Sequence, residues 1–84
     1  MLDVSPYYTH TTTTSNPGYI GKPNSSIDII DRKTGELLTR RWYGANGRAI
    51  RDVDYTHHNN TKTHPEAPHE HTWTYDKDGN PFRN

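Results

Sequence analysis

Three short turns, each ending in glycine, recur along this chain. They are Lys33-Thr34-Gly35, Ala45-Asn46-Gly47 and Lys77-Asp78-Gly79. Glycine in the third place is typical of a type I turn that is closed by a left-handed residue and a bulge. A turn of this kind joins two antiparallel strands, so the first two copies predict a three-stranded antiparallel meander.

The runs on either side of these turns are strand-like. Ile27–Arg32, Leu37–Tyr43 and Ala49–Thr56 contain the β-branched and aromatic residues that strands favour. A fourth run, His69–Tyr75, alternates and so places His69, His71, Trp73 and Tyr75 on one side. No helical period occurs in the sequence. We therefore predict a mainly β protein, a small antiparallel meander sheet of about four strands.

The turn type also predicts which residues face each other. With the strands paired outwards from the turns, Asp28, Arg40 and Asp52 align across three strands. Opposite charges placed directly across strands stabilise a sheet by about 0.2–1 kcal/mol per pair. A two-residue Asn-Gly turn, which would set Arg40 against Val53, loses this alignment and is disfavoured.

The same register places Arg41 opposite Arg51. Two facing cations are destabilising unless an anion lies between them. One interpretation is that both side chains reach water, or that Asp31 or Glu70 neutralises them. The other is a phosphate site, because paired arginines suit an oxyanion.

The N-terminal part has a different character. Residues 1–26 are rich in Thr, Ser, Asn, Pro and Gly and show no apolar period. Only 27% of the 84 residues are hydrophobic, which indicates that part of the chain is not packed. We expect residues 1–26 to be a flexible arm, with Tyr7, Tyr8, Tyr19 and Ile20 able to dock on the sheet, and residues 27–84 to be the β-sheet domain.

Composition excludes several classes of function. The chain has no cysteine, so it forms no disulfide and no thiolate metal site. Ten basic and ten acidic residues balance, which removes any overall attraction to nucleic acid or to an anionic membrane. No apolar run reaches transmembrane length and the first residues do not resemble a signal peptide. A cytoplasmic location without a membrane partner is expected.

Five of the six histidines lie between Tyr55 and Tyr75. Pro65 and Pro68 favour extended backbone before them, so a His/Pro-rich loop is expected between the third and fourth strands. A three-histidine zinc site is one interpretation, using His69 and His71 with a third ligand among His57, His58 and His64. The helical His-Glu-x-x-His spacing is absent, and we predict no metal and no cofactor.

Acid–base chemistry is the other interpretation of this segment, because histidine both accepts and donates protons near neutral pH. A ribonuclease that uses no metal needs a base, an acid, cations for the phosphate and aromatic faces for the bases. The candidates for acid–base catalysis are His64, His69 and His71; for phosphate binding, Arg41, Arg51 and Lys62; for base stacking, Tyr43, Tyr55 and Trp73. A histidine in a proline-rich loop is, however, more often a solvated or turn-forming residue.

A family resemblance rests on the same residues. The runs Asp52-Val53-Asp54-Tyr55-Thr56, Lys62-Thr63-His64-Pro65 and Pro68-His69-Glu70-His71 occur in this order. With the preceding residues from Ser25, they resemble a small domain of Firmicutes mobile elements and prophages. That domain occurs at the C-terminal ends of polymorphic toxins and phage head-morphogenesis proteins, and as short standalone proteins.

The resemblance implies a nuclease-like toxin domain that acts on RNA, with an immunity protein or another protein as partner. The alternative is a non-catalytic module of a mobile element that binds protein or nucleic acid. Similarity of fold does not decide between the two.

Overall fold

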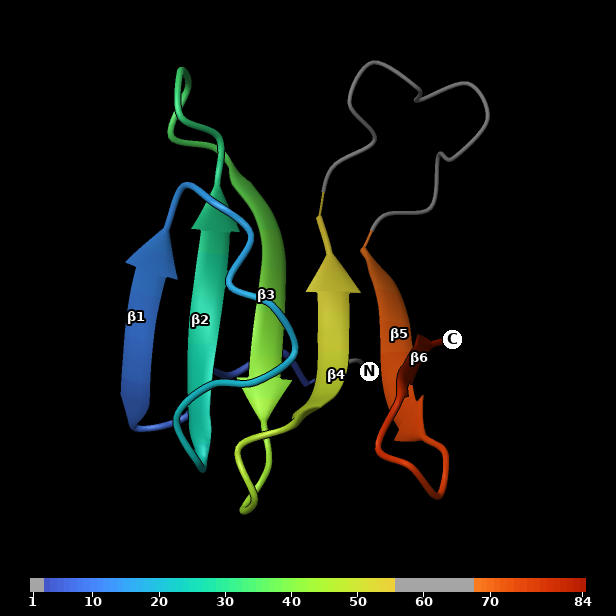
Figure 1. Ribbon diagram of the computed structural model, residues 1–84. Helices are drawn as coiled ribbons and strands as arrows, with labels where there is room; N and C mark the ends of the chain where they lie inside the picture. The colour runs from blue at the N-terminus through green and yellow to red at the C-terminus, as the bar shows by residue number, and fades with distance from the viewer. Residues whose placement is uncertain (1–2, 56–67) are drawn as a thin grey trace.

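The structure is a computed structural model that describes residues 3–55 and 68–84. These residues form one open sheet of six strands that lie side by side in chain order (Figure 1). The strands are β1 (Thr9–Thr13), β2 (Ser25–Ile30), β3 (Leu37–Tyr43), β4 (Ala49–Asp54), β5 (His69–Tyr75) and β6 (Pro81–Arg83). Within the described ranges there is no helix, which confirms the mainly β class.

The predicted turns are present. Gly35, Gly47 and Gly79 all have the positive φ that a left-handed turn residue requires, at 74°, 81° and 86°. Neighbouring strands from β2 to β6 are antiparallel, so the meander is confirmed. The third turn adds β6, a strand that the prediction of about four strands did not include.

The expectation of a flexible arm is wrong for Thr9–Thr13. These residues form β1, which pairs in parallel with β2. A parallel pair needs a crossover, and residues 14–24 provide it by passing over one face of the sheet (Figure 1). Threonine is β-branched and suits a strand, although a run of threonines has no apolar alternation to reveal it. The proposed domain boundary at residue 26 falls inside β2.

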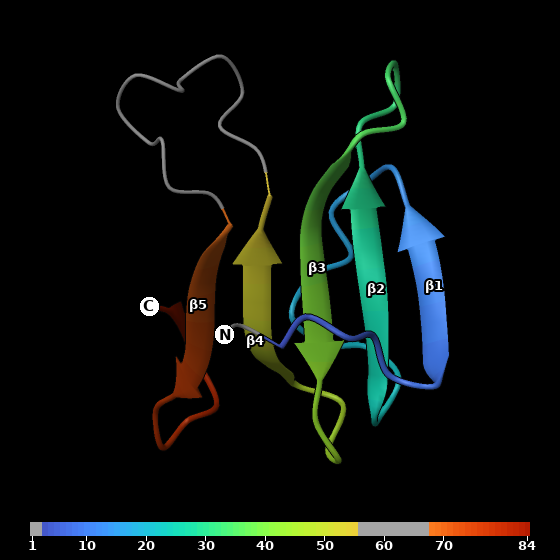
Figure 2. The same ribbon diagram turned by 180° about the vertical axis from the view of Figure 1, so that it is seen from behind.

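The sheet has two distinct faces. The crossover face carries Arg41, and residues 14–24 cover part of it, since the Arg41 Nη1 donates to the carbonyl oxygen of Gly18. The N-terminal face carries Arg40 and Trp42. Residues 3–8 cross this face, as Figure 2 shows from behind, and their carbonyl oxygens accept from both side chains. Chain segments thus cover parts of both faces, where many folds use a second layer.

A single bulged residue overturns the predicted pairing of β3 with β4. Tyr43 faces Ala49 as the turn requires, but the next pair is Trp42 with Arg51, so Ile50 is an extra residue on β4. An extra residue shifts the register by one and moves every later side chain to the other face. Arg41 therefore faces Asp52.

This shift corrects two predictions. Arg41 and Arg51 do not face each other but lie on opposite faces of the sheet, and Arg40 faces Val53, the pairing that had been disfavoured. The pairing of Asp28 with Arg40 is confirmed. The turn itself was predicted correctly, so the error comes from the bulge alone.

The apolar core is small. Its buried hydrophobic residues are Trp42, Tyr43, Ala49 and Val53. Charged groups are buried with them, because Asp52 has no exposed surface and Arg41 very little. The centre of this sheet is therefore held by ion pairs as well as by apolar contact.

Candidate functional site

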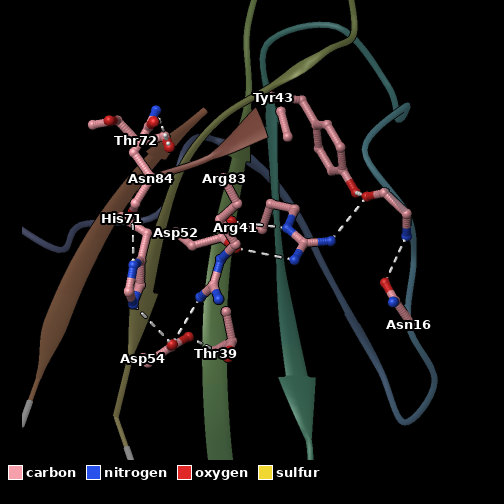
Figure 3. Close-up of polar contacts among 12 residues, drawn as sticks. Asn16, Thr39, Arg41, Tyr43, Asp52, Asp54, His71, Thr72, Arg83 and Asn84 are labelled. Carbon is pink, nitrogen blue, oxygen red and sulfur yellow. Dashed lines mark hydrogen bonds and ion pairs between the residues drawn. The ribbon is translucent and has the colours of Figure 1, made fainter. Parts of the chain in front are cut away.

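A row of charged side chains crosses the crossover face from β3 to β6 (Figure 3). At its inner end Arg41 binds Asp52 with two hydrogen bonds, from Nε at 2.8 Å and from Nη2 at 3.0 Å. Asp52 also accepts from the Arg83 Nε at 2.9 Å. A buried carboxylate with three such bonds is fully paired, so this end of the row is structural.

The other end of the row is centred on Asp54, the last residue of β4. Its Oδ2 accepts from the Arg83 Nη2 at 2.7 Å and lies 3.2 Å from the His71 Nε2, while Thr39 donates to Oδ1 at 2.7 Å. Burial by itself would raise the pKa of Asp54, but the hydrogen bonds from Arg83 and Thr39 and the charges of Arg83 and His71 outweigh it and lower the pKa. Asp54 is therefore a stable carboxylate.

Two acceptors hold the imidazole of His71. The Nε2 faces Asp54, and the Nδ1 lies 2.9 Å from the main-chain oxygen of Asn84. A ring protonated on both nitrogens donates to both acceptors. The position of the ring is therefore set from two sides.

The exposure of the row increases towards its outer end. The Asp52 side chain is 0% exposed, whereas those of Asp54, His71 and Arg83 are 27%, 31% and 36% exposed. We call His71, Asp54 and Arg83 the outer cluster. It combines an imidazole, a carboxylate and a guanidinium at a place that solvent reaches.

The structure separates the histidines and cations that the sequence analysis grouped. His69 and His71 lie on β5 at alternate positions and so on one face, as predicted. Arg51 lies on the N-terminal face, where it forms an ion pair with Glu70 and stacks 4.4 Å from the centre of the Trp42 ring. A phosphate site built on both Arg41 and Arg51 is therefore excluded. His64 and Lys62 lie outside the described residues.

The three aromatic candidates differ in their surroundings. Tyr43 is only 2% exposed and its hydroxyl donates to the Gly18 carbonyl, so its ring offers no face to a nucleic-acid base. Burial raises the pKa of this hydroxyl. Trp73 is half-buried, with the Arg41 guanidinium 5.0 Å from its ring centre. The buried Tyr55 hydroxyl and Trp73 Nε1 have no hydrogen-bond partner within the described part of the chain.

Three members of the site were missed by the sequence analysis as functional residues: Arg83, Asp54 and Thr39. A signal for Arg83 was present, because the Lys77-Asp78-Gly79 turn folds β6 back along β5 and pairs Arg83 with Trp73. Asp54 belongs to the Asp-x-Asp motif but was used only for the resemblance. Thr39 has no comparable signal in the sequence.

A second histidine–carboxylate pair lies on the N-terminal face. The His10 Nε2 is 3.2 Å from the Asp28 Oδ2, and its Nδ1 is 2.6 Å from the Ser26 Oγ. Ser26 is 1% exposed and its hydroxyl also accepts from the Tyr7 main chain. Although a serine, a histidine and an aspartate are in contact, the hydroxyl is out of reach of a substrate. The contacts instead join residues 3–8, β1 and β2.

Residues 3–55 and 68–84 contain no group of three or more histidine, aspartate or glutamate side chains placed to hold a metal ion. The zinc alternative required a ligand from His57, His58 or His64, and these lie outside the described residues. In the same two ranges, no helix is long and apolar enough to cross a membrane.

Comparisons with family models, with curated proteins and with solved structures found no match to this chain. The resemblance to a mobile-element domain therefore stays a prediction.

Proposed function

We propose that this chain is a ribonuclease-like domain that needs no metal, and that the outer cluster is its acid–base centre. The observation that supports this is the contact of His71 and Arg83 with the same oxygen of Asp54, at 3.2 and 2.7 Å, in a place open to solvent. The proposal keeps RNA as the substrate class and replaces Arg41 and Arg51 with Arg83.

The chemistry is attack of a ribose 2′-hydroxyl on the adjacent phosphodiester. A base removes the proton from the 2′-oxygen, this oxygen forms a new bond to phosphorus, and the bond from phosphorus to the 5′-oxygen breaks. An acid gives the leaving oxygen a proton, and the products are a 2′,3′-cyclic phosphate and a 5′-hydroxyl. Acid–base catalysis of this kind contributes about 10²- to 10⁴-fold.

His71 is assigned the role of acid because its two ring nitrogens face two acceptors, Asp54 at Nε2 and the Asn84 main-chain oxygen at Nδ1, and the leaving oxygen takes the place of the Asn84 oxygen. Asp54 orients the ring, and Arg83 supplies positive charge for the phosphate. His69 lies two residues away on the same face of β5 and is the candidate base. Two strand residues at this spacing are about 6.6–6.8 Å apart along the strand, a separation that a scissile phosphate can bridge.

The biological setting extends the proposal. The resemblance favours a toxin-type domain of a mobile element that acts on RNA in the cytoplasm and is held in check by a protein partner. Lys62 and His64 remain sequence-based candidates for this site, since they belong to the segment that joins β4 to β5.

The test is cleavage of a labelled RNA in the presence of EDTA. We expect His71→Ala to lower the rate by about 100-fold or more. His10→Ala is the matched control, because it removes a histidine with an equally close carboxylate on the opposite face, and it should keep the wild-type rate. Absence of cleavage by the wild type, or equal rates in all three proteins, contradicts the proposal.

A second candidate is the non-catalytic binding module. It is favoured by the observation that Arg83, which binds Asp52 and Asp54, and both ring nitrogens of His71 already have partners within the chain. In that case the outer cluster serves stability, and His71→Ala lowers the melting temperature of a protein that never cleaves RNA.

A further inference from the structure

The two edges of the sheet are built differently. β6 is three residues long, begins with a proline that has no N–H to offer, and carries Arg83. Short length, proline and charge are the devices by which proteins prevent an edge strand from pairing with another chain. β1, at the other edge, has five residues, none of them proline, lysine, arginine or an acidic residue.

β1 also lies straight along its neighbour. Its five residues pair with β2 in a continuous register, without a bulge. Its outer side has no strand beside it in the part of the chain that the structure describes. The main-chain N–H of Tyr7, just before β1, donates to the Ser26 Oγ, so the entry to the strand is anchored. This edge is a preformed template for one more strand.

We propose that the occupant is a second copy of this chain, whose β1 pairs with β1 in antiparallel fashion about a two-fold axis at Thr11. In this register Thr9 faces Thr13 of the second copy and Thr11 faces its own counterpart. The side chains of His10 and Thr12 lie on the other side of the strand, and there His10 of each copy faces Thr12 of the other. Threonine pairs across strands are favourable, and in this register no two permanent charges of like sign face each other.

The residue before β1 supports the same partner. The Tyr8 side chain is fully exposed, although aromatic rings are enriched where protein surfaces meet. Tyr8 directly precedes β1 and Thr14 directly follows it, so the antiparallel register brings Tyr8 of each copy to the end of β1 of the other.

Symmetry explains why the assembly stops at two. An interface about a two-fold axis uses the same patch on both copies and leaves no further β1 exposed. The edge at β6, which is short and contains a proline and an arginine, does not pair with a further strand. The outer cluster lies on β4, β5 and β6, away from β1, so dimerisation does not depend on the proposed activity.

The test is sedimentation equilibrium over a wide range of protein concentration. The wild type should form a dimer. Thr11→Lys and Thr11→Glu each place two like charges at the axis and should weaken the dimer by about twofold to fivefold. A mixture of the two variants should form a one-to-one heterodimer, because opposite charges then meet. This recovery also shows that both variants are folded.

Phe82→Lys is the control at the other edge, since Phe82 is an exposed residue of β6. It should leave the dimer intact. A wild type that is monomeric at all concentrations overturns the proposal, as does a dimer that Phe82→Lys breaks and Thr11→Lys spares. Amide exchange on the wild type gives an independent measurement, and protection of β1 that does not rise with concentration also overturns it.

Discussion

Arg41 and Asp52 lie directly opposite each other on β3 and β4 and form a buried ion pair with two hydrogen bonds. The bulge at Ile50 creates this relationship, because without the extra residue Arg41 would face a second arginine. One residue in a hairpin therefore decides whether Arg41 faces a second arginine or a carboxylate. It also turns Arg51 away from the proposed active site.

The first prediction concerns this pair. Asp52→Asn keeps the shape of the side chain but removes the charge that three arginine N–H groups use. Because it leaves Arg41 as a buried cation without its counter-ion, the free energy of unfolding should fall by about 3–5 kcal/mol. Urea unfolding measures this loss.

Asp78→Asn is the matched control, an identical change at an exposed turn residue. It should alter the free energy of unfolding by less than about 0.5 kcal/mol. Equal effects of the two substitutions would show that the buried pair contributes nothing particular to stability.

The second prediction separates backbone strain from crowding at two turn glycines. Gly35 and Gly47 both have positive φ, but a Cβ at Gly35 meets nothing within 4 Å, whereas at Gly47 it comes 2.7 Å from the Gly21 carbonyl oxygen. Gly35→Ala should therefore cost only the left-handed backbone penalty of about 1–2 kcal/mol. Gly47→Ala should cost clearly more, as thermal unfolding of both variants would reveal, and a smaller cost at Gly47 would contradict the close approach of the crossover.

The third prediction is a loss of stability in acid. Burial alone would raise the pKa of Asp28, but hydrogen bonds and charges from Arg40 and His10 lower it below the ordinary 3.8, and the pKa of Asp54 is lowered in the same way. The folded state thus binds fewer protons than the unfolded chain. The stabilisation from these two carboxylates is complete above pH 3.8, and it is lost as the pH falls through their folded pKa values.

Melting temperature against pH checks this directly. The wild type should melt at progressively lower temperature in that acidic range, and Asp28→Asn should flatten the curve because it removes one of the two groups. A wild-type curve that stays level in acid would contradict the lowered pKa values.

The fourth prediction concerns the anchoring of residues 3–8. The Ser26 hydroxyl accepts from the Tyr7 main chain and contacts His10. Ser26→Ala should therefore release the Tyr7 amide, which would exchange with solvent faster. Ser25→Ala is the control, because Ser25 instead donates to the Lys22 carbonyl in the crossover. Unchanged exchange at Tyr7 in Ser26→Ala would mean that other contacts hold this segment.

Much of the fold was accessible from local patterns. Glycine at the third turn position and the alternation of His69–Tyr75 depend on neighbouring residues only, and both predictions are confirmed. The bulge at Ile50 depends on which side chains meet across two strands, and no local rule for the turn reveals it. β1 depends on a partner strand beyond a crossover, so its threonines resembled a linker.

The candidate site divides in the same way. His71 was found because the alternation of β5 places it beside His69. Arg83 was missed because its role requires β6 to fold back and bring residues 52, 54 and 83 together. Contacts of this kind follow from the register of three strands, which the sequence suggested only in part.

The proposed function requires that His71 serves cleavage by a ribose 2′-hydroxyl. The most direct measurement uses a DNA oligonucleotide that contains a single ribonucleotide, incubated with the protein in EDTA and analysed by mass spectrometry. We predict one cut, on the 3′ side of the ribonucleotide, with a 2′,3′-cyclic phosphate that His71→Ala no longer produces and His10→Ala still does. An uncut oligonucleotide, or equal cutting of an all-DNA strand, would contradict the account.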